Sequence, residues 1–125
     1  MPRADLAARL LAFTRVLTDE EISMSAEELL CFLTVAVRPG ISVGELAEEA
    51  GLPQSTVSRH LKRLCARAHR SKGELGPIQW DLEIGSDPLI AQHVHPTNPK
   101  QKALQVTRHG EALLDRFEHV MNGAS

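Results

Sequence analysis

Polar and basic side chains gather on one face of residues 53–68, a stretch whose spacing predicts a helix. Its apolar residues Val57, Leu61, Leu64 and Ala68 recur at i, i+4, i+7 and i+11, so they form a single stripe. The rest of the helix surface carries hydrogen-bond donors and positive charge and no carboxylate: Gln54, Ser55, Thr56, Ser58, Arg59, Lys62 and Arg63. Such side chains bind phosphates and base edges, and a helix fits the major groove of double-stranded DNA. We therefore predict that these seven residues contact DNA.

The segment before this helix predicts a second, shorter one. Ser42 and Glu45 have the spacing of a capping box, in which each side chain satisfies a backbone donor at the start of a helix. Gly51 suits the left-handed turn that ends such a helix, and Pro53 is well tolerated at the first position of the next one. Residues 42–68 are thus predicted to form a helix-turn-helix. The alternative interpretation is an ordinary helical hairpin with a solvated cationic face.

The charges of the chain are segregated along the sequence. The 125 residues carry a net charge of only −2. Residues 50–73, however, hold six Lys or Arg and no Asp or Glu, and residues 88–110 hold three and again no acid. These two segments carry +9, which leaves −11 for the remaining residues. A basic surface on an acidic body indicates a phosphate-binding face. The length of the chain separately predicts a single domain over residues 1–125.

Helices with apolar stripes are predicted at both ends of the chain, over residues 3–17 and 108–122. The stripes consist of Leu6, Leu10, Phe13 and Leu17 in the first helix and of Leu113, Phe117 and Val120 in the last. This apolar surface exceeds what one small core needs, so we predict a homodimer in which these seven residues form the interface. Between these helices, Ser25 and Glu28 form a second capping box, which starts a mostly apolar helix that ends near Val37.

Strands are predicted within residues 77–107. Residues 78–84 alternate apolar and polar side chains, which favours a half-buried strand. Residues 89–95 and 102–107 are two further predicted strands, so that the three form a β-meander or a hairpin with an extra strand. Lys100 and Lys102 lie at the tip of this predicted wing and are expected to contact the DNA backbone. The fold class is mainly α with a small β-sheet, a winged helix-turn-helix with N- and C-terminal flanking helices.

Two segments resemble the MarR family of bacterial transcription regulators. They are ELAEEAGLPQSTVSRHLKRL (residues 45–64) and LIAQHVHPTNPKQKALQVTRHGEALLDRF (residues 89–117). The family closes its wing with an LxLTxxGxxL-like segment, which Leu104–Gly110 and Leu113 match here. The resemblance covers residues 41–117. It implies a dimer with terminal helices packed across a twofold axis and one recognition helix from each subunit in the major groove.

The chain departs from that family in two places. The wing tip of the family usually carries Asp and Arg, whereas this chain has lysines there, and residues 67–88 are an insertion by family standards. The segment Ser58–Leu61 is equally similar to the metal-sensing ArsR family. That family has a Cys-x-Cys thiolate site in the first helix of the motif, and this chain has none there.

The sequence gives weaker support to redox sensing, metal binding, catalysis and membrane insertion. Cys31 and Cys65 lie within apolar helical patterns and have no metal or disulfide spacing, which suits a reducing cytoplasm. A redox sensor at Cys31 is a minor alternative, because an apolar setting raises the pKa of a thiol and keeps it unreactive. His93 and His95 would point to the same side of a strand, but with no third ligand we predict no metal site. The sequence contains no phosphate-binding glycine loop, nucleophile elbow or acid–base pair, so neither an enzyme nor a cofactor is predicted. No apolar run is long enough to span a membrane.

The sequence therefore predicts a cytoplasmic, sequence-specific double-stranded DNA-binding transcription regulator, a repressor that responds to an effector of unknown identity. The alternative is a winged-helix protein-interaction module, an adaptor or antirepressor without specific DNA binding. The salt dependence of binding discriminates between these two functions, because binding to phosphates weakens steeply as the salt concentration rises and binding through an apolar surface does not.

Overall fold

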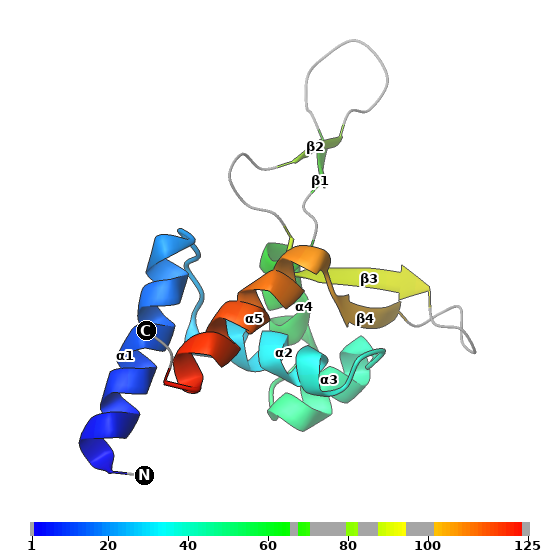
Figure 1. Ribbon diagram of the computed structural model, residues 1–125. Coiled ribbons are helices and arrows are strands. Elements are labelled where there is room, and N and C mark those ends of the chain that lie inside the picture. Colours follow the sequence, from blue (N-terminus) through cyan, green and yellow to red (C-terminus); the bar gives the residue numbers. More distant parts are fainter. Residues whose placement is uncertain (1, 66–67, 71–79, 83–87, 95–101, 124–125) are drawn as a thin grey trace.

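The computed structural model describes residues 2–65, 68–70, 80–82, 88–94 and 102–123. The described helices are α1 (Arg3–Asp19), α2 (Ala26–Val37), α3 (Val43–Ala50), α4 (Gln54–Leu64) and α5 (Arg108–Met121). The described strands are β1 (Ala68–Arg70), β2 (Trp80–Leu82), β3 (Ile90–Val94) and β4 (Lys102–Val106). Figure 1 shows α2, α3 and α4 clustered beside the β3–β4 hairpin, with α5 between this cluster and α1. Among the described helices, none combines the length and the apolar character needed to cross a membrane.

Both predicted capping boxes are present at the starts of their helices. The Ser25 hydroxyl accepts a hydrogen bond from the backbone N–H of Glu28 at 3.1 Å, and the Glu28 carboxylate accepts one from the N–H of Ser25 at 3.0 Å. Ser42 and Glu45 make the same two bonds, both at 3.1 Å. Gly51 follows α3 with a φ of 69°, in the left-handed region. These local signals confirm the predicted starts of α2 and α3 and the predicted turn of the helix-turn-helix.

The hydrophobic core lies where α2, α3 and α4 meet the β3–β4 hairpin and α5. Its most deeply buried large side chains, all less than 2% exposed, are Phe32, Leu46, Leu61, Ile90, Leu104, Val35 and Val57. They come from α2, α3, α4, β3 and β4, so each of these elements contributes a stripe to one core. The burial of Val57 and Leu61 fixes which side of α4 faces inward.

The β3–β4 hairpin forms the wing, and it is hydrogen-bonded to the helix-turn-helix. The two strands pair antiparallel, with Ile90 opposite Val106 and Val94 opposite Lys102. Leu104 of β4 also pairs with the chain before α3, since its N–H donates to the Ile41 carbonyl at 2.9 Å and its carbonyl accepts from Gly40 at 2.8 Å. This pairing holds the wing beside the start of α3. The connection between the strands, residues 95–101, lies outside the described residues.

Helix α4 is shorter than the sequence predicts. Its apolar spacing continues to Ala68, but α4 ends at Leu64, and Ala68 instead begins strand β1. The Leu64 carbonyl accepts a hydrogen bond from the Leu89 N–H at 2.9 Å, and Cys65 forms a parallel bridge with Ile90. The backbone after Leu64 therefore pairs with the residues at the start of the wing and cannot continue the helix. This is a tertiary contact, which the spacing of apolar residues in one helix does not predict.

The strand predicted at residues 78–84 is described over Trp80–Leu82, and its partner differs from the prediction. This strand, β2, pairs antiparallel with β1, with Ala68 opposite Leu82 and Arg70 opposite Trp80. The described strands form two separate two-stranded sheets, β1–β2 and β3–β4. A three-stranded meander is thus wrong. Alternation of side chains predicts a strand but does not identify the strand that pairs with it. Ala68, the first residue of the partner strand β1, had been assigned to the helix.

Helix α1 packs on α5 and so removes part of the apolar surface at the two ends of the chain. The rings of Phe13 and Phe117 lie with their centroids 4.3 Å apart. Leu113 and Phe117 are 2% and 5% exposed, so they belong to the hydrophobic core of the chain itself. Leu6 and Leu10 remain 43% and 47% exposed. Of the seven residues predicted to form the dimer interface, the exposed ones are thus Leu6 and Leu10, in the N-terminal half of α1.

Candidate nucleic-acid interface

The two sides of α4 differ in burial as the sequence predicts. Val57, Leu61 and Leu64 are at most 3% exposed. On the remaining surface, Thr56 is half-buried and the other six predicted contact residues are exposed: Gln54, Ser55, Ser58, Arg59, Lys62 and Arg63. The helix thus presents a polar, basic surface to solvent while its apolar stripe holds it in the core.

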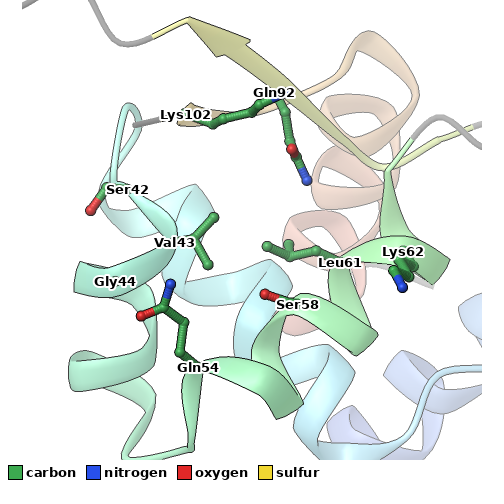
Figure 2. A pocket seen from close by; sticks show the side chains of 9 residues that line it. All are labelled: Ser42, Val43, Gly44, Gln54, Ser58, Leu61, Lys62, Gln92 and Lys102. Carbon is green, nitrogen blue, oxygen red and sulfur yellow. The ribbon is translucent and has the colours of Figure 1, made fainter. Parts of the chain in front are cut away.

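A groove of about 560 Å³ lies between α4, the start of α3 and the wing. We call it the wing groove. Figure 2 shows its lining side chains, which are Ser42, Val43, Gly44, Gln54, Ser58, Leu61, Lys62, Gln92 and Lys102. Gln54, Ser58 and Lys62 come from α4, and Lys102 comes from β4, so the fold brings four of the predicted DNA-contact residues to one surface.

The lining of the wing groove combines two ammonium groups with hydroxyl and amide groups, and none of the nine side chains is acidic. Such a groove is complementary to an anionic, hydrogen-bonding strand such as a sugar–phosphate backbone. Sequence reasoning missed Gln92 and the lining role of Ser42. Gln92 lies on an exposed position of β3 with no motif around it, and Ser42 was interpreted only as a helix cap.

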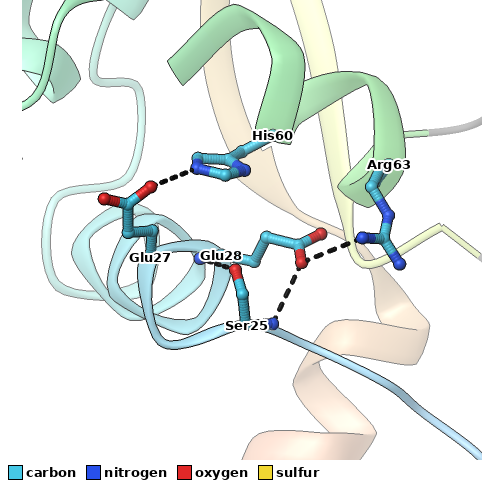
Figure 3. A network of polar contacts seen from close by, with 5 residues as sticks. All are labelled: Ser25, Glu27, Glu28, His60 and Arg63. Carbon is cyan, nitrogen blue, oxygen red and sulfur yellow. Dashed lines mark hydrogen bonds and ion pairs between the residues drawn. The ribbon is translucent and has the colours of Figure 1, made fainter. Parts of the chain in front are cut away.

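Arg63 and its neighbour His60 are oriented differently from the rest of the polar surface of α4. Arg63 Nη1 lies 3.3 Å from Glu28 Oε1, and His60 Nε2 lies 2.8 Å from Glu27 Oε1. Figure 3 shows both pairs joining α4 to the first turn of α2. These pairs could not be predicted from sequence patterns, because their members are 33 and 35 residues apart.

The two cysteines have reduced reactivity for a physical reason. Burial raises the pKa of the Cys31 thiol, and the nearby carboxylates of Glu27 and Glu28 raise this pKa further. Burial also raises the pKa of Cys65, while the hydrogen bond from Gln92 Nε2, at 3.4 Å, lowers it. Because the thiolate is the reactive form, neither thiol is activated at neutral pH.

Of the two histidines considered as a ligand pair, His93 is exposed on β3 and His95 lies outside the described residues. In the part of the chain that the structure describes, no group of three or more His, Cys, Asp or Glu is arranged to hold a metal ion. Lys100, the second predicted contact of the wing, also lies outside the described residues.

Residues 22–69, which contain α2, α3 and α4, match the sequence model of the MarR family. No curated protein sequence matches the chain at a significant level.

Solved structures that share the fold of the chain include a protein–DNA complex and two transcriptional regulators. S. aureus MepR in complex with DNA superposes with a TM-score of 0.62 at 16% identity, covering 88% of this chain and 73% of MepR. The regulator Tm0710 from Thermotoga maritima gives a TM-score of 0.66 at 17% identity, covering 97% of this chain and 70% of that protein. PcaV from Streptomyces coelicolor, solved with its natural ligand, gives 0.53 at 17% identity, covering 94% and 76%. The chain therefore has the winged helix-turn-helix fold of these structures, and its residues 22–69 are similar to the MarR family.

Proposed function

We propose that the chain is a sequence-specific double-stranded DNA-binding transcription regulator, a cytoplasmic repressor that acts as a homodimer. The observation that carries this proposal is the exposed polar and basic surface of α4, adjacent to a wing groove that has no acidic lining. A MarR-like fold with these features fits a recognition helix in the major groove. MepR, which has the same fold, was solved as a complex with DNA.

The proposed contacts divide by chemistry. Gln54, Ser55, Thr56, Ser58 and Arg59 belong to the part of α4 that would enter the groove and reach base edges. Lys62, Lys100 and Lys102 would bind phosphates, with the backbone of one strand lying along the wing groove. Arg63 is left out of this set, because it is paired with a carboxylate of α2.

The direct test is to select bound sequences from a random pool of duplexes and to measure affinity for the selected site against salt. Each neutralised phosphate contributes a slope of about −0.9 in log K against log salt, so a DNA regulator should lose affinity steeply. Selection of no preferred sequence, or affinity independent of salt, would contradict the proposal.

One observation favours the alternative of a protein-interaction module. Leu30, Leu33 and Val37 on α2 are 42%, 36% and 79% exposed, and they form an apolar stripe on the surface. A module that bound its partner through this stripe would show little salt dependence. The same salt measurement therefore discriminates between the two functions.

Regulation by a small-molecule effector is part of the proposal. PcaV, a structural relative, was solved with its natural ligand. We propose no enzymatic activity, since the matched family and the structural relatives are named as regulators. The effector of this chain would be found by screening for compounds that release it from its selected site.

Arg59→Ala is expected to weaken binding to the preferred site by about 1–3 kcal/mol and to broaden sequence preference. Arg59 is exposed on α4, and a guanidinium can donate two parallel hydrogen bonds to guanine. Competition binding with specific and random duplexes measures both effects. Arg15→Ala, which removes an exposed charge of the same kind from α1, is the matched control and should change neither quantity. An equal loss on specific and random DNA would make Arg59 a phosphate contact instead.

Replacing Lys100 and Lys102 with Ala together is expected to reduce the salt slope by about 1–2 units and to leave sequence preference largely intact. Lys102 lines the wing groove, and neither lysine has an acidic neighbour in the sequence, so both are expected to act on phosphates through their charge. Titrations of DNA at several salt concentrations give the slope. An unchanged slope would show that the wing does not bind DNA in this protein.

A further inference from the structure

The first turn of α2 holds α4 through two pairs of polar side chains (Figure 3). His60 Nε2 lies 2.8 Å from Glu27 Oε1, and the side chain of His60 is only 13% exposed. Arg63 Nη1 lies 3.3 Å from Glu28 Oε1, and the side chain of Glu28 is 3% exposed. Because His60 and Arg63 are three residues apart, they lie on the same side of α4, next to its buried stripe. We call these four residues the α2–α4 clamp.

Glu28 is the central residue of the clamp. Its carboxylate accepts from the Ser25 N–H at 3.0 Å and is paired with the Arg63 guanidinium. A carboxylate this deeply buried is costly unless it is both paired and hydrogen-bonded. Removing Arg63 would leave the charge of Glu28 without its cationic partner. The Arg63 side chain itself is 54% exposed, but if a DNA phosphate attracted it away the same cost would arise at Glu28, so the pair opposes contact between Arg63 and DNA.

The helix dipoles favour the same arrangement. Glu27 and Glu28 occupy the first turn of α2, where the N-terminal end of the dipole stabilises negative charge. Arg63 occupies the last turn of α4, where the C-terminal end stabilises positive charge. Each clamp charge thus suits its own helix end as well as its partner.

We propose that Glu27 and Glu28 are positioning residues for sequence recognition, which act on DNA binding through His60 and Arg63. The two side-chain pairs add directional contacts to the buried stripe of α4, and such contacts oppose rotation of the helix about its axis. Arg59 is one helical turn before Arg63, so the rotation that the clamp sets determines where Arg59 meets the bases. This inference rests on the proposed DNA-binding function, and it assigns Arg63 to positioning although the sequence pattern favours DNA contact.

The experiment compares Glu28→Gln, Arg63→Ala and Lys62→Ala in the full chain, using one selected duplex and one random duplex. Gln at position 28 can still accept the capping hydrogen bond from Ser25, so this change removes mainly the charge. Glu28→Gln is expected to lower the ratio of specific to random affinity about tenfold without weakening binding to random DNA. Arg63→Ala should lower the same ratio and leave the salt slope unchanged. Lys62→Ala, the adjacent residue that lines the wing groove, should reduce the salt slope by about one unit.

Melting temperatures provide a readout of the pair that does not depend on DNA. Arg63→Ala should lower the melting temperature by about 5 °C or more, and Arg63→Lys, which keeps the charge, should recover part of that loss. The double variant Glu28→Gln, Arg63→Ala should melt above Arg63→Ala, because no uncompensated carboxylate remains.

The outcomes separate the two proposals. A parent chain that shows no selective, salt-dependent binding refutes the proposed function and the positioning role together. Selective binding by the parent with unchanged selectivity in Glu28→Gln refutes the positioning role alone. A loss of salt slope in Arg63→Ala equal to that in Lys62→Ala would make Arg63 a phosphate contact and would also overturn the inference.

Discussion

The double substitution Leu6→Asp and Leu10→Asp is expected to convert the protein from a dimer to a monomer and to abolish specific binding to an inverted repeat. Both leucines project from α1 with 43% and 47% of their surface exposed in the protomer. A dimer that packs α1 across a twofold axis would bury them, and a carboxylate placed there would be desolvated without a partner. Because two linked recognition helices bind far more tightly than one, the loss should be on the order of 10²-fold or more.

The choice of these two positions depends on the packing of α1 on α5. Phe13 was predicted as an interface residue, but its ring contacts Phe117, so a charge at position 13 would also disturb the protomer. Leu11→Asp is the matched control, since Leu11 is 53% exposed and lies one position along the same helix on a different face.

Light scattering, circular dichroism and DNA titration of the three proteins would give the result. We expect the double variant to keep its helical signal, to scatter as a monomer and to lose selectivity, while Leu11→Asp resembles the parent. If the parent is itself a monomer at micromolar concentration and still binds a single half-site, the dimer proposal is wrong.

Features that local chemistry determines were predictable from the sequence. A capping box needs only Ser and Glu three residues apart, and both such boxes start helices in the structure. Gly51 was predicted to leave α3 in the left-handed conformation because few other residues adopt it cheaply, and it does so. The exposed polar side of α4 followed from the spacing of its apolar residues. These signals extend over one or two helical turns, which is the range over which side chains of one helix interact.

Features that depend on distant partners were not predictable. The end of α4 at Leu64 is set by the backbone of Leu89. The position of Arg63 depends on Glu28, a residue that the sequence identified only as part of a cap. Leu89 and Glu28 both lie outside α4, so neither the periodicity nor the helix propensity of the α4 sequence predicts these contacts. A basic face deduced from one helix therefore overestimates the number of residues available to DNA.

The glycine of the segment that closes the wing is explained by packing rather than by DNA contact. Thr107 caps α5 by accepting from the Gly110 N–H at 3.0 Å, and its hydroxyl donates to the Pro88 carbonyl at 2.6 Å. These bonds hold the first turn of α5 against the backbone that leads into β3. A Cβ at position 110 would lie 2.5 Å from Val106 Cγ1 and 2.6 Å from the Leu89 carbonyl oxygen.

Gly110→Ala is therefore expected to destabilise the fold by about 1–3 kcal/mol or more, although it places a better helix former in a helix. The Leu89 carbonyl cannot easily move away, because the Leu89 N–H is bonded to Leu64 and the carbonyl itself accepts from Thr107. Gly44→Ala is the matched control. It makes the same chemical change in α3, where nothing lies within 4 Å of the added carbon, so it should stabilise the chain by up to about 1 kcal/mol. Urea unfolding of the two variants should give free-energy changes of opposite sign. Stabilisation by Gly110→Ala would show that α5 can shift away from β3, and that the wing is held less tightly than its hydrogen bonds indicate.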